Sequence, residues 1–200
     1  SYSDYLFLEA TARKEYSSTL PPKNNNYFYP SVNGSFVFSD AFTMPEAISY
    51  GKVRASYGIV GNAAPMYVSN VSYTQDALQS INGSVAALAL SSSYGNNNLK
   101  AETKYERELG LEMKFLEDRI GFDISYYDNV VKDQIMDLST AASVGATSQI
   151  VNVGEIASNG LELALNATPV RGTVHWSTRF NIGFNKSKVN KLATGVPQLI

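Results

Sequence analysis

The sequence contains no cysteine and only one histidine among its 200 residues. Without cysteine, the chain can form neither a disulfide framework nor a thiolate nucleophile or metal site. It also lacks a long apolar run, because the longest one, residues 85–90, is far shorter than the ~20 residues that a membrane-spanning helix needs. Any membrane-spanning part must therefore be built from strands.

An excess of one charge sign is also missing. The 16 Lys and Arg residues face 18 Asp and Glu residues, and no long run of one sign occurs, so nucleic acid is not an expected partner. Aromatic residues, in contrast, are abundant, with 13 tyrosines and nine phenylalanines. Together with Gly, Ser and Asn clusters between the apolar stretches, they favour an all-β fold.

Residues 1–4 have no starting methionine and no signal-peptide pattern, and the C-terminal residues run into a loop. We therefore expect residues 1–200 to be an internal section of a longer polypeptide.

Seven segments alternate apolar and polar residues with a period of two, which is the pattern of a strand whose two faces meet different surroundings. None of them has a helical period. The apolar positions are Leu6, Leu8, Ala10 and Ala12; Val32, Phe36 and Phe38; Val53, Ala55, Tyr57 and Ile59; Leu109, Leu111, Met113 and Phe115; Ile120, Phe122, Ile124 and Tyr126; Leu161, Leu163, Leu165 and Ala167; and Trp176, Phe180, Ile182 and Phe184.

The opposite faces of these strands carry full charges, which are tolerated only where water wets the surface that they face. We predict that these charges face a lumen, where they tune passage or pair with one another. They are Glu9, Arg13, Lys52, Arg54, Glu108, Glu112 and Arg179.

The connections between the segments alternate in length. Residues 117–119 and 168–172 form short turns, while residues 15–27, 62–101 and 133–155 form long loops. The link 39–50 is expected on the short side, with a helical turn at 44–48. Transmembrane barrels place short turns in the periplasm and long loops outside. We therefore predict an antiparallel up-and-down transmembrane β-barrel, of which about seven strands form an incomplete section, because single-chain bacterial barrels have an even number of strands.

Several blocks of sequence resemble, in the family's order, the SusC/RagA-like branch of TonB-dependent outer-membrane transporters. The blocks are LEATAR at 8–13, YPSV at 29–32, SFVF at 35–38, KVRASYG at 52–58, NLKAE at 98–102, ELGLE at 108–112, RIGFDISYY at 119–127, NVGEI at 152–156 and NGLEL at 159–163. They extend over nearly the whole chain, which makes the resemblance specific.

The resemblance implies a barrel of roughly 22 strands with a plugged lumen in the outer membrane of a Gram-negative bacterium. Residues 1–200 would be part of the barrel domain, with the plug, the signal peptide and the other strands outside this chain. It further implies import of an oligosaccharide or peptide nutrient, a SusD-like surface lipoprotein as a lid, energy supplied by TonB through the plug, contact with outer-membrane lipid, and no cofactor.

The long loop 62–101 contains the residues that we expect to contact cargo. Tyrosine rings could stack on sugar rings, and asparagine side chains could hydrogen-bond to sugar hydroxyls. The candidates are Tyr67, Tyr73, Tyr94, Asn96 and Asn97. The alternatives are that the loop packs on its own aromatic residues or on a partner protein, and that the asparagines form turns.

Two other classes of function are weighed against transport. A soluble surface protein that binds glycans would bury the apolar face between two sheets. A membrane-embedded hydrolase would need a serine or asparagine next to His175, although Trp176 fits an interfacial aromatic girdle better. No metal site is expected, because Asp123, Asp128, Asp133 and Asp137 are spaced by four or five residues, and a spacing of five sends neighbours on a strand to opposite faces, which gives no compact calcium site.

Overall fold

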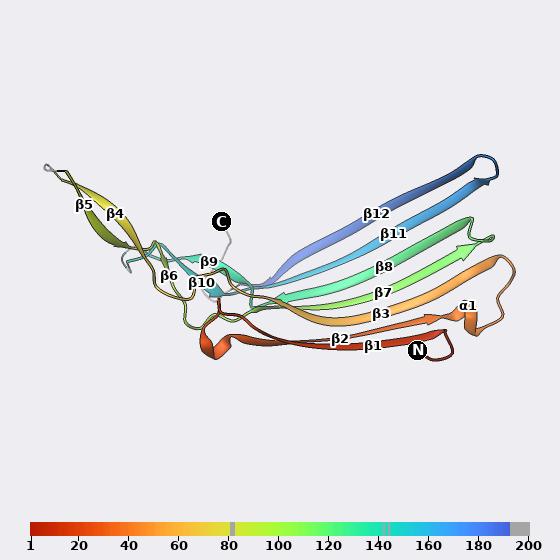
Figure 1. Cartoon of the computed structure of the whole chain (residues 1–200), viewed down its shortest axis with the longest axis horizontal. Coiled ribbons are helices and arrows are strands. Elements are labelled where there is room, and N and C mark those ends of the chain that lie inside the picture. Colours follow the sequence, from red (N-terminus) through yellow and green to blue (C-terminus); the bar gives the residue numbers. More distant parts are fainter. Residues whose placement is uncertain (81–82, 142, 144, 193–200) are drawn as a thin grey trace.

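The structure is a computed structural model that describes residues 1–80, 83–141, 143 and 145–192. Seven long strands form one sheet in the order β1-β2-β3-β7-β8-β11-β12 (Figure 1). These strands are β1 (Leu6–Tyr16), β2 (Asn26–Val37), β3 (Ile48–Asn62), β7 (Glu102–Phe115), β8 (Ile120–Lys132), β11 (Glu155–Arg171) and β12 (His175–Lys191). Every neighbouring pair is antiparallel, which confirms the predicted up-and-down order.

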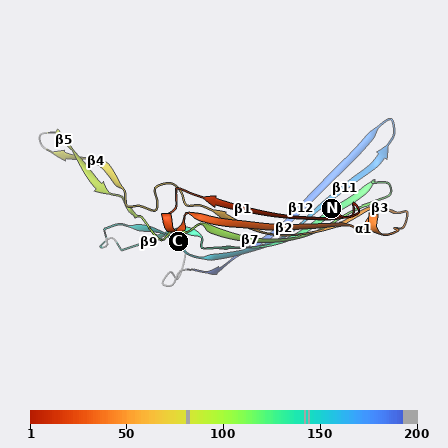
Figure 2. The same ribbon diagram turned by 60° about the horizontal axis from the view of Figure 1, so that its bottom comes forward.

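The seven strands form a single curved layer, as Figure 1 and the turned view in Figure 2 show. Strands β1 and β12 are its two edges, and neither edge is paired with another of the described strands on its outer side. Unpaired backbone groups at a sheet edge are costly in lipid, so both edges require a neighbouring strand when the sheet lies in a membrane.

One face of this sheet carries the predicted apolar belt. The register places Leu111, Ile124 and Leu163 side by side on β7, β8 and β11. Within the described residues no second layer covers this face. Leu109 and Phe180 are 60% and 57% accessible, and Leu111, Ile124 and Leu163 are half-buried by their neighbours in the sheet. The belt is therefore an uncovered outer surface and not the core of a two-sheet sandwich.

The short connections differ in detail from the prediction. The turn between β7 and β8 is residues 116–119, where Leu116, Glu117 and Asp118 adopt positive φ angles. The second turn is residues 172–174 and not 168–172, because β11 continues to Arg171. Pro169 lies at a shift of register between β11 and β12 and does not end the strand, since a β-bulge accommodates a residue without an N–H group.

The prediction of a helical turn at 44–48 was also wrong, because the helix lies earlier in the chain. The short helix α1 is Phe38–Ala41, with Asp40 in its first turn. Phe38 therefore leaves the strand pattern, and its ring covers Gly51 of β3. Pro45 instead begins a tight turn in which the Ile48 N–H donates to the Pro45 carbonyl at 2.9 Å, since β3 starts too soon for a helix. Among the described residues, no helix is long and apolar enough to cross a membrane.

The long loops at the other end of the sheet contain short elements of their own. A short 3₁₀ helix, η1 (Pro22–Asn24), lies in the first loop. The second loop contains the hairpin β4 (Tyr73–Ser80) and β5 (Gly83–Leu90), followed by β6 (Ser93–Tyr94), and the third contains β9 (Ile135–Ser139) and β10 (Ser148–Asn152). Strands β6, β10 and β9 form a small sheet, and the hairpin extends away from the rest (Figure 1).

The apolar belt yields a first prediction. Leu163→Arg places a charge at the middle of the belt, and we expect it to lower the free energy of unfolding by about 2–4 kcal/mol, the cost of an arginine facing hydrocarbon. Ala164→Arg is the matched control, because position 164 lies on the opposite face, in register with Asp123 and Asn181. The measurement is urea unfolding of the full-length protein in lipid vesicles. Equal losses for both variants would contradict the assignment of faces.

Candidate lumen site and outer loops

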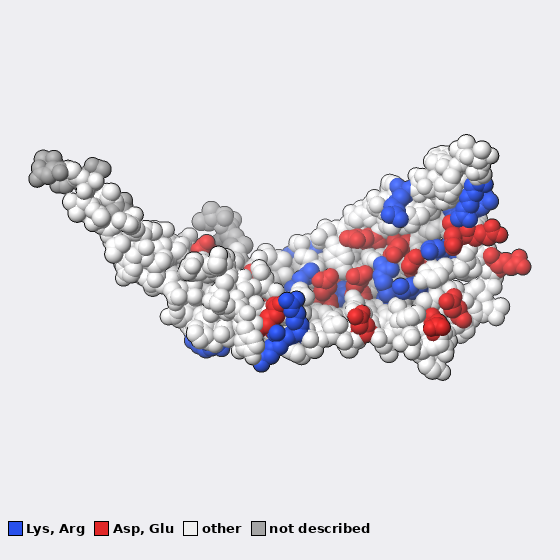
Figure 3. Space-filling view, in the orientation of Figure 1, with Lys and Arg blue, Asp and Glu red and all other residues white. Residues whose placement is uncertain are grey.

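The face opposite the apolar belt carries charges of both signs. Figure 3 shows acidic and basic side chains side by side along the seven-stranded sheet. By their register, all seven charges predicted to face a lumen lie on this face: Glu9, Arg13, Lys52, Arg54, Glu108, Glu112 and Arg179. We call it the charged face below.

Arg54 is the centre of a network that joins three strands. Its Nη1 and Nη2 donate to the two carboxylate oxygens of Asp123 at 3.0 and 2.7 Å, and Nη2 also donates to Ser125 Oγ at 2.5 Å. Its Nε lies 3.4 Å from Glu108 Oε1. The fork of two parallel hydrogen bonds fixes the planar guanidinium in direction as well as distance. Arg54 thus ties β3 to β7 and β8.

A glycine makes this crossing possible. Gly110 of β7 lies directly between Arg54 and Ser125 in the register. A Cβ atom at Gly110 would lie 2.5 Å from Arg54 Cζ and 2.7 Å from Arg54 Cγ, closer than atoms can approach. Only a residue without a side chain lets the arginine extend over β7 to reach β8.

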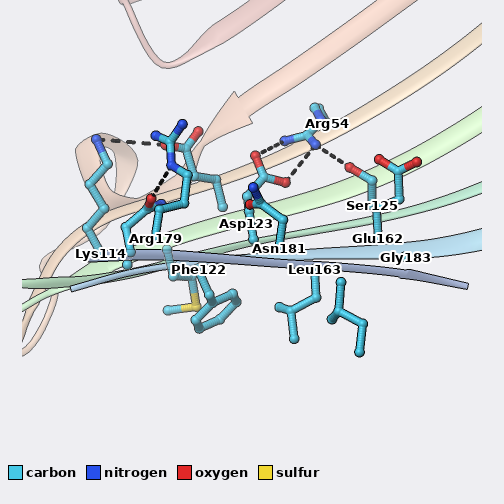
Figure 4. Close-up of a pocket in the computed structure, with 16 residues that line it drawn as sticks. Arg54, Lys114, Phe122, Asp123, Ser125, Glu162, Leu163, Arg179, Asn181 and Gly183 are labelled. Carbon is cyan, nitrogen blue, oxygen red and sulfur yellow. Dashed lines mark hydrogen bonds and ion pairs between the residues drawn. The ribbon is translucent and has the colours of Figure 1, made fainter. Parts of the chain in front are cut away.

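The charged face is hollowed beside this network, and Figure 4 shows the side chains that line the hollow. Arg179 of β12 donates from Nε to Asn166 Oδ1 at 2.7 Å. Lys114 Nζ lies 3.7 Å from Glu112 Oε1. Within the described residues, the Glu162 carboxylate has neither an ion pair nor a hydrogen bond. The hollow can therefore accept a cationic group without breaking an existing pair.

The sequence pattern predicted that these charges share one face, but it did not predict which of them form pairs. Asp123, Ser125 and Glu162 belong to the lining of the hollow, and none of them was among the predicted site residues. Their positions on the polar side of the alternation were the only available signal. Of the four aspartates considered for calcium, Asp123 and Asp128 both belong to β8 and lie on opposite faces, since Asp123 is in register with Glu112 and Asp128 is in register with Arg107.

The five candidate cargo residues are placed differently from one another. Tyr67 and Tyr73 have exposed side chains, 81% and 65% accessible. Asn97 is exposed as well, whereas Tyr94 is half-buried in β6. Asn96 is engaged in the loop itself, because its Nδ2 donates to the Ile150 carbonyl at 3.0 Å and its Oδ1 accepts from the Asn98 N–H at 2.9 Å. Of the five, Tyr67, Tyr73 and Asn97 are open to a ligand.

The three long loops share one small core. Leu20 from the first loop packs with Ala64 and Leu99 from the second, and Ile135 and Ile150 from the third pack against them. Leu99 is fully buried there. Parts of all three loops thus form one packed layer over the outer end of the strands, from which the hairpin of β4 and β5 extends.

Asparagine side chains join the loops around this core. Asn152 Nδ2 donates to the carbonyls of Lys100 and Asp133 at 2.9 and 2.8 Å, and its Oδ1 accepts from the Lys100 N–H at 2.8 Å. Asn24 Nδ2 donates to the Leu99 carbonyl at 3.0 Å. Apart from the bond to Asp133, which lies in the same loop as Asn152, these contacts satisfy backbone groups of another loop, so the side chains are more than turn formers.

His175 is the first residue of β12, exposed and in register with Arg171. In the part of the chain that the structure describes, no serine or asparagine side chain hydrogen-bonds to it. The hydrolase alternative depends on such a contact and gains no support from this geometry.

Comparison with known proteins identifies what the chain is similar to. The family model described as TonB dependent receptor-like, beta-barrel matches residues 1–198. The TonB-dependent receptor P3 of Formosa agariphila is 30% identical over 201 residues, which cover 96% of this chain and 20% of that protein. The TonB-dependent receptor P26 of the same organism is 29% identical over 192 residues, 94% of this chain and 19% of that protein. The chain thus spans about one fifth of the length of these relatives.

Solved structures share the fold. The RagAB peptide importer in its 'closed-closed' state matches with a TM-score of 0.85 at 22% identity, over 96% of this chain and 21% of that chain. The siderophore receptor PirA from Pseudomonas aeruginosa matches with a TM-score of 0.60 at 23% identity, over 96% of this chain and 35% of that chain.

The Arg54 network yields a second prediction. In a double-mutant cycle of Arg54→Ala and Asp123→Ala, we expect a coupling free energy of about 1 kcal/mol, measured by urea unfolding of the full-length protein. The value is modest because the two side chains remain 29% and 35% exposed, and solvent weakens the pair. Arg54→Lys should keep the charge but lose most of the coupling, since an ammonium cannot form the fork. Additive effects of the two alanine substitutions would show that the pair does not contribute.

The joined loops yield a third prediction. Asn152→Ala should open the outer loops to limited proteolysis in intact cells, with cleavage about tenfold or more faster. The variant loses two hydrogen bonds to Lys100, which join two loops, and one to Asp133 in its own loop, and each contributes about 1 kcal/mol. Asn97→Ala is the control, since Asn97 is exposed and has no side-chain hydrogen bond among the described residues. Unchanged cleavage of the Asn152 variant would refute the role of this side chain.

Proposed function

Because the chain belongs to the TonB-dependent receptor-like β-barrel family, we propose that it forms part of the wall and outer loops of a nutrient importer. Proteins of this family lie in the outer membrane of Gram-negative bacteria, and this is where the chain resides. In the proposal, residues 1–200 are one section of the barrel domain. The plug, the signal peptide and the other strands belong to the rest of a longer protein.

The observation that carries this proposal is the two-faced sheet. An uncovered apolar belt on one side and a face of mixed charge on the other are what a strand needs between lipid and a water-filled lumen. A soluble glycan-binding module would instead cover its apolar face with a second layer, and the described residues supply none. The same sheet therefore argues for the importer and against the soluble alternative.

The cargo in this proposal is an oligosaccharide or an oligopeptide. A peptide is supported by the fold match to the RagAB peptide importer. Either class suits the exposed rings of Tyr67 and Tyr73, because aromatic faces stack on sugar rings and on peptide planes alike. Tyr94, Asn96 and Asn97 stay in the proposal as part of the loop that meets cargo, with Asn96 shaping the loop from within.

A SusD-like lipoprotein is the proposed partner at the cell surface, closing over cargo held on the outer loops. The hairpin of β4 and β5 supports an interacting protein, since an isolated two-stranded hairpin is marginally stable in water. Its side chains of Leu78, Val85 and Leu88 are exposed. TonB is the proposed second partner, acting through the plug and so moving it away from the charged face.

The charged face has two proposed roles in transport. Paired charges such as Arg54 and Asp123 hold the wall rigid, because they tie strands together. Glu162, which has no partner among the described residues, is available to a cationic group of the plug or of passing cargo. Glu9, Arg13, Lys52, Glu108, Glu112 and Arg179 give the face its mixed sign, so neither a cation nor an anion is trapped on it.

The proposal yields a fourth prediction. In the organism that encodes the full-length protein, Tyr67→Ala with Tyr73→Ala should lower uptake of the cargo about tenfold or more, since each stacking ring contributes about 1 kcal/mol. Uptake is measured with labelled oligosaccharides and oligopeptides supplied in turn, in wild-type cells, in the double variant and in a deletion strain.

The control is Tyr2→Ala, an exposed tyrosine at the end of the sheet opposite the long loops, with the protein level checked by immunoblotting of outer membranes. Loss of uptake in the deletion strain for one cargo class only would identify that class. Normal uptake of every tested oligosaccharide and oligopeptide by the deletion strain would refute nutrient import by this protein.

A further inference from the structure

A group of basic side chains lies on the lipid side of the sheet, just beyond the outer edge of the apolar belt. Leu109, Tyr126, Leu161 and Phe184 form the last row of this face that is apolar on all four of β7, β8, β11 and β12. On the loop side of that row, the same face presents Arg107, Lys132, Lys186 and Lys188. We call these four residues the rim patch.

The rim patch differs from the basic residues at the same height on the charged face. There, Lys104 Nζ lies 2.5 Å from Glu106 Oε2, and Arg13 pairs with Glu15. The four cations of the rim patch are all exposed, and none forms an ion pair with another described residue. Lys104 and Arg13 on the charged face are thus paired with carboxylates, whereas the cations of the rim patch are not. The rim patch therefore presents positive charge to the surroundings of the apolar belt.

Two carboxylates share this surface and do not cancel it. Asp128 lies in register with Arg107, and Glu155 lies in register with Lys132, where it accepts a hydrogen bond from Asn190 Nδ2 at 3.2 Å. The four cations outnumber them by two. Lys132 also lies over the ring of Tyr105, with its Nζ 5.4 Å from the ring centroid. A lysine on an aromatic ring at the edge of an apolar belt is typical of the membrane interface.

The surroundings of the rim patch decide what it binds. It is continuous with the belt that faces lipid, and it lies on the side of the long outer loops. The outer leaflet of a Gram-negative outer membrane consists of lipopolysaccharide, whose headgroups carry phosphates. Arginine and lysine bind phosphate through charge-assisted hydrogen bonds, which strengthen where water is scarce. A further strand paired with β12 would lie in the plane of the sheet and would leave Lys186 and Lys188 facing outward.

We propose that the rim patch of Arg107, Lys132, Lys186 and Lys188 binds the phosphates of a lipopolysaccharide headgroup in the outer leaflet. The belt holds the acyl chains of the same molecule, so the site has an apolar and a cationic part. Bound lipid then covers the outward face of β7, β8, β11 and β12. The proposal is independent of cargo and partner, because it needs only the outer-membrane location.

The test uses delipidated full-length protein in detergent and three probes. The first is bisphosphorylated lipid A, the second is the same lipid A after enzymatic removal of both phosphates, and the third is inorganic phosphate. Native mass spectrometry measures bound lipid. We expect the wild-type protein to bind the first probe about tenfold or more better than the second, and we expect inorganic phosphate at 10-fold excess not to displace it.

The variants are Arg107→Gln with Lys132→Gln, Lys186→Gln with Lys188→Gln, and all four together. Each pair should weaken binding of phosphorylated lipid A about tenfold or more, since each cation near an anionic surface contributes about 1 kcal/mol, which is about a fivefold change in affinity. Lys104→Gln, the same change on the opposite face of β7, should leave binding unchanged.

Three outcomes would overturn the proposal. They are equal binding of lipid A with and without phosphates, undiminished binding by the pair variants, or displacement of lipid A by inorganic phosphate, which would make the patch a site for free phosphate. If the fourfold variant fails to fold, the two pair variants decide the question alone.

Discussion

The pairing of every strand with its neighbours in one fixed register is the constraint on which the rest of this structure depends. In hydrocarbon an unpaired N–H or carbonyl group costs several kcal/mol, so strands must exchange all their backbone hydrogen bonds within the sheet. Once the register is fixed, side chains can only alternate between the two faces. The apolar belt, the charged face and the rim patch all follow from that alternation, because shifting one strand by a single residue would exchange its two faces.

The Arg54 network depends on the same register. Arg54, Gly110 and Ser125 are 71 residues apart at their extremes, yet they form one line across β3, β7 and β8. The arginine reaches Asp123 only because the residue beneath it is glycine. The contact therefore belongs to the sheet as a whole, and a change of register on either side of β7 would separate the fork from its carboxylate.

The sequence predicted the strands well and the connections less well, for one physical reason. A strand between lipid and water needs an apolar side chain at every second position. Leu161, Leu163 and Leu165 therefore repeat the same signal three times within one strand. A turn has no such repeat, so its position in the sequence is indicated only once. Residues 168–172 were predicted as a turn, but β11 continues to Arg171, with Pro169 at a β-bulge. The common core of Leu20, Ala64 and Leu99, and the partners of Arg54, depend on which residues far apart in sequence meet, which no local pattern encodes.

The positions at which the strands start also give the tilt of the strands relative to the membrane. Strand β1 starts at Leu6, in the row of Leu111, whereas β12 starts at His175, in the row of Arg171. Following the register from β1 to β12, these starts are displaced by about eight residues over six strand-to-strand steps. With a rise of about 3.4 Å per residue and a strand spacing of about 4.8 Å, the line that joins the starts is inclined by about 40° to the rows.

That inclination falls within the tilt of about 35–45° that strands adopt in membrane barrels. An apolar belt that lies parallel to the membrane must then run obliquely across the rows of paired residues. It therefore extends further towards the loops on β3 than on β7. Ile59 of β3 is still apolar one row beyond Arg107, and Tyr57 shares a row with Arg107 itself. The rim patch therefore lies on β7, β8 and β12, where the continuous apolar stretch ends at the row of Leu109, Tyr126 and Phe184 and the polar positions that meet headgroups follow.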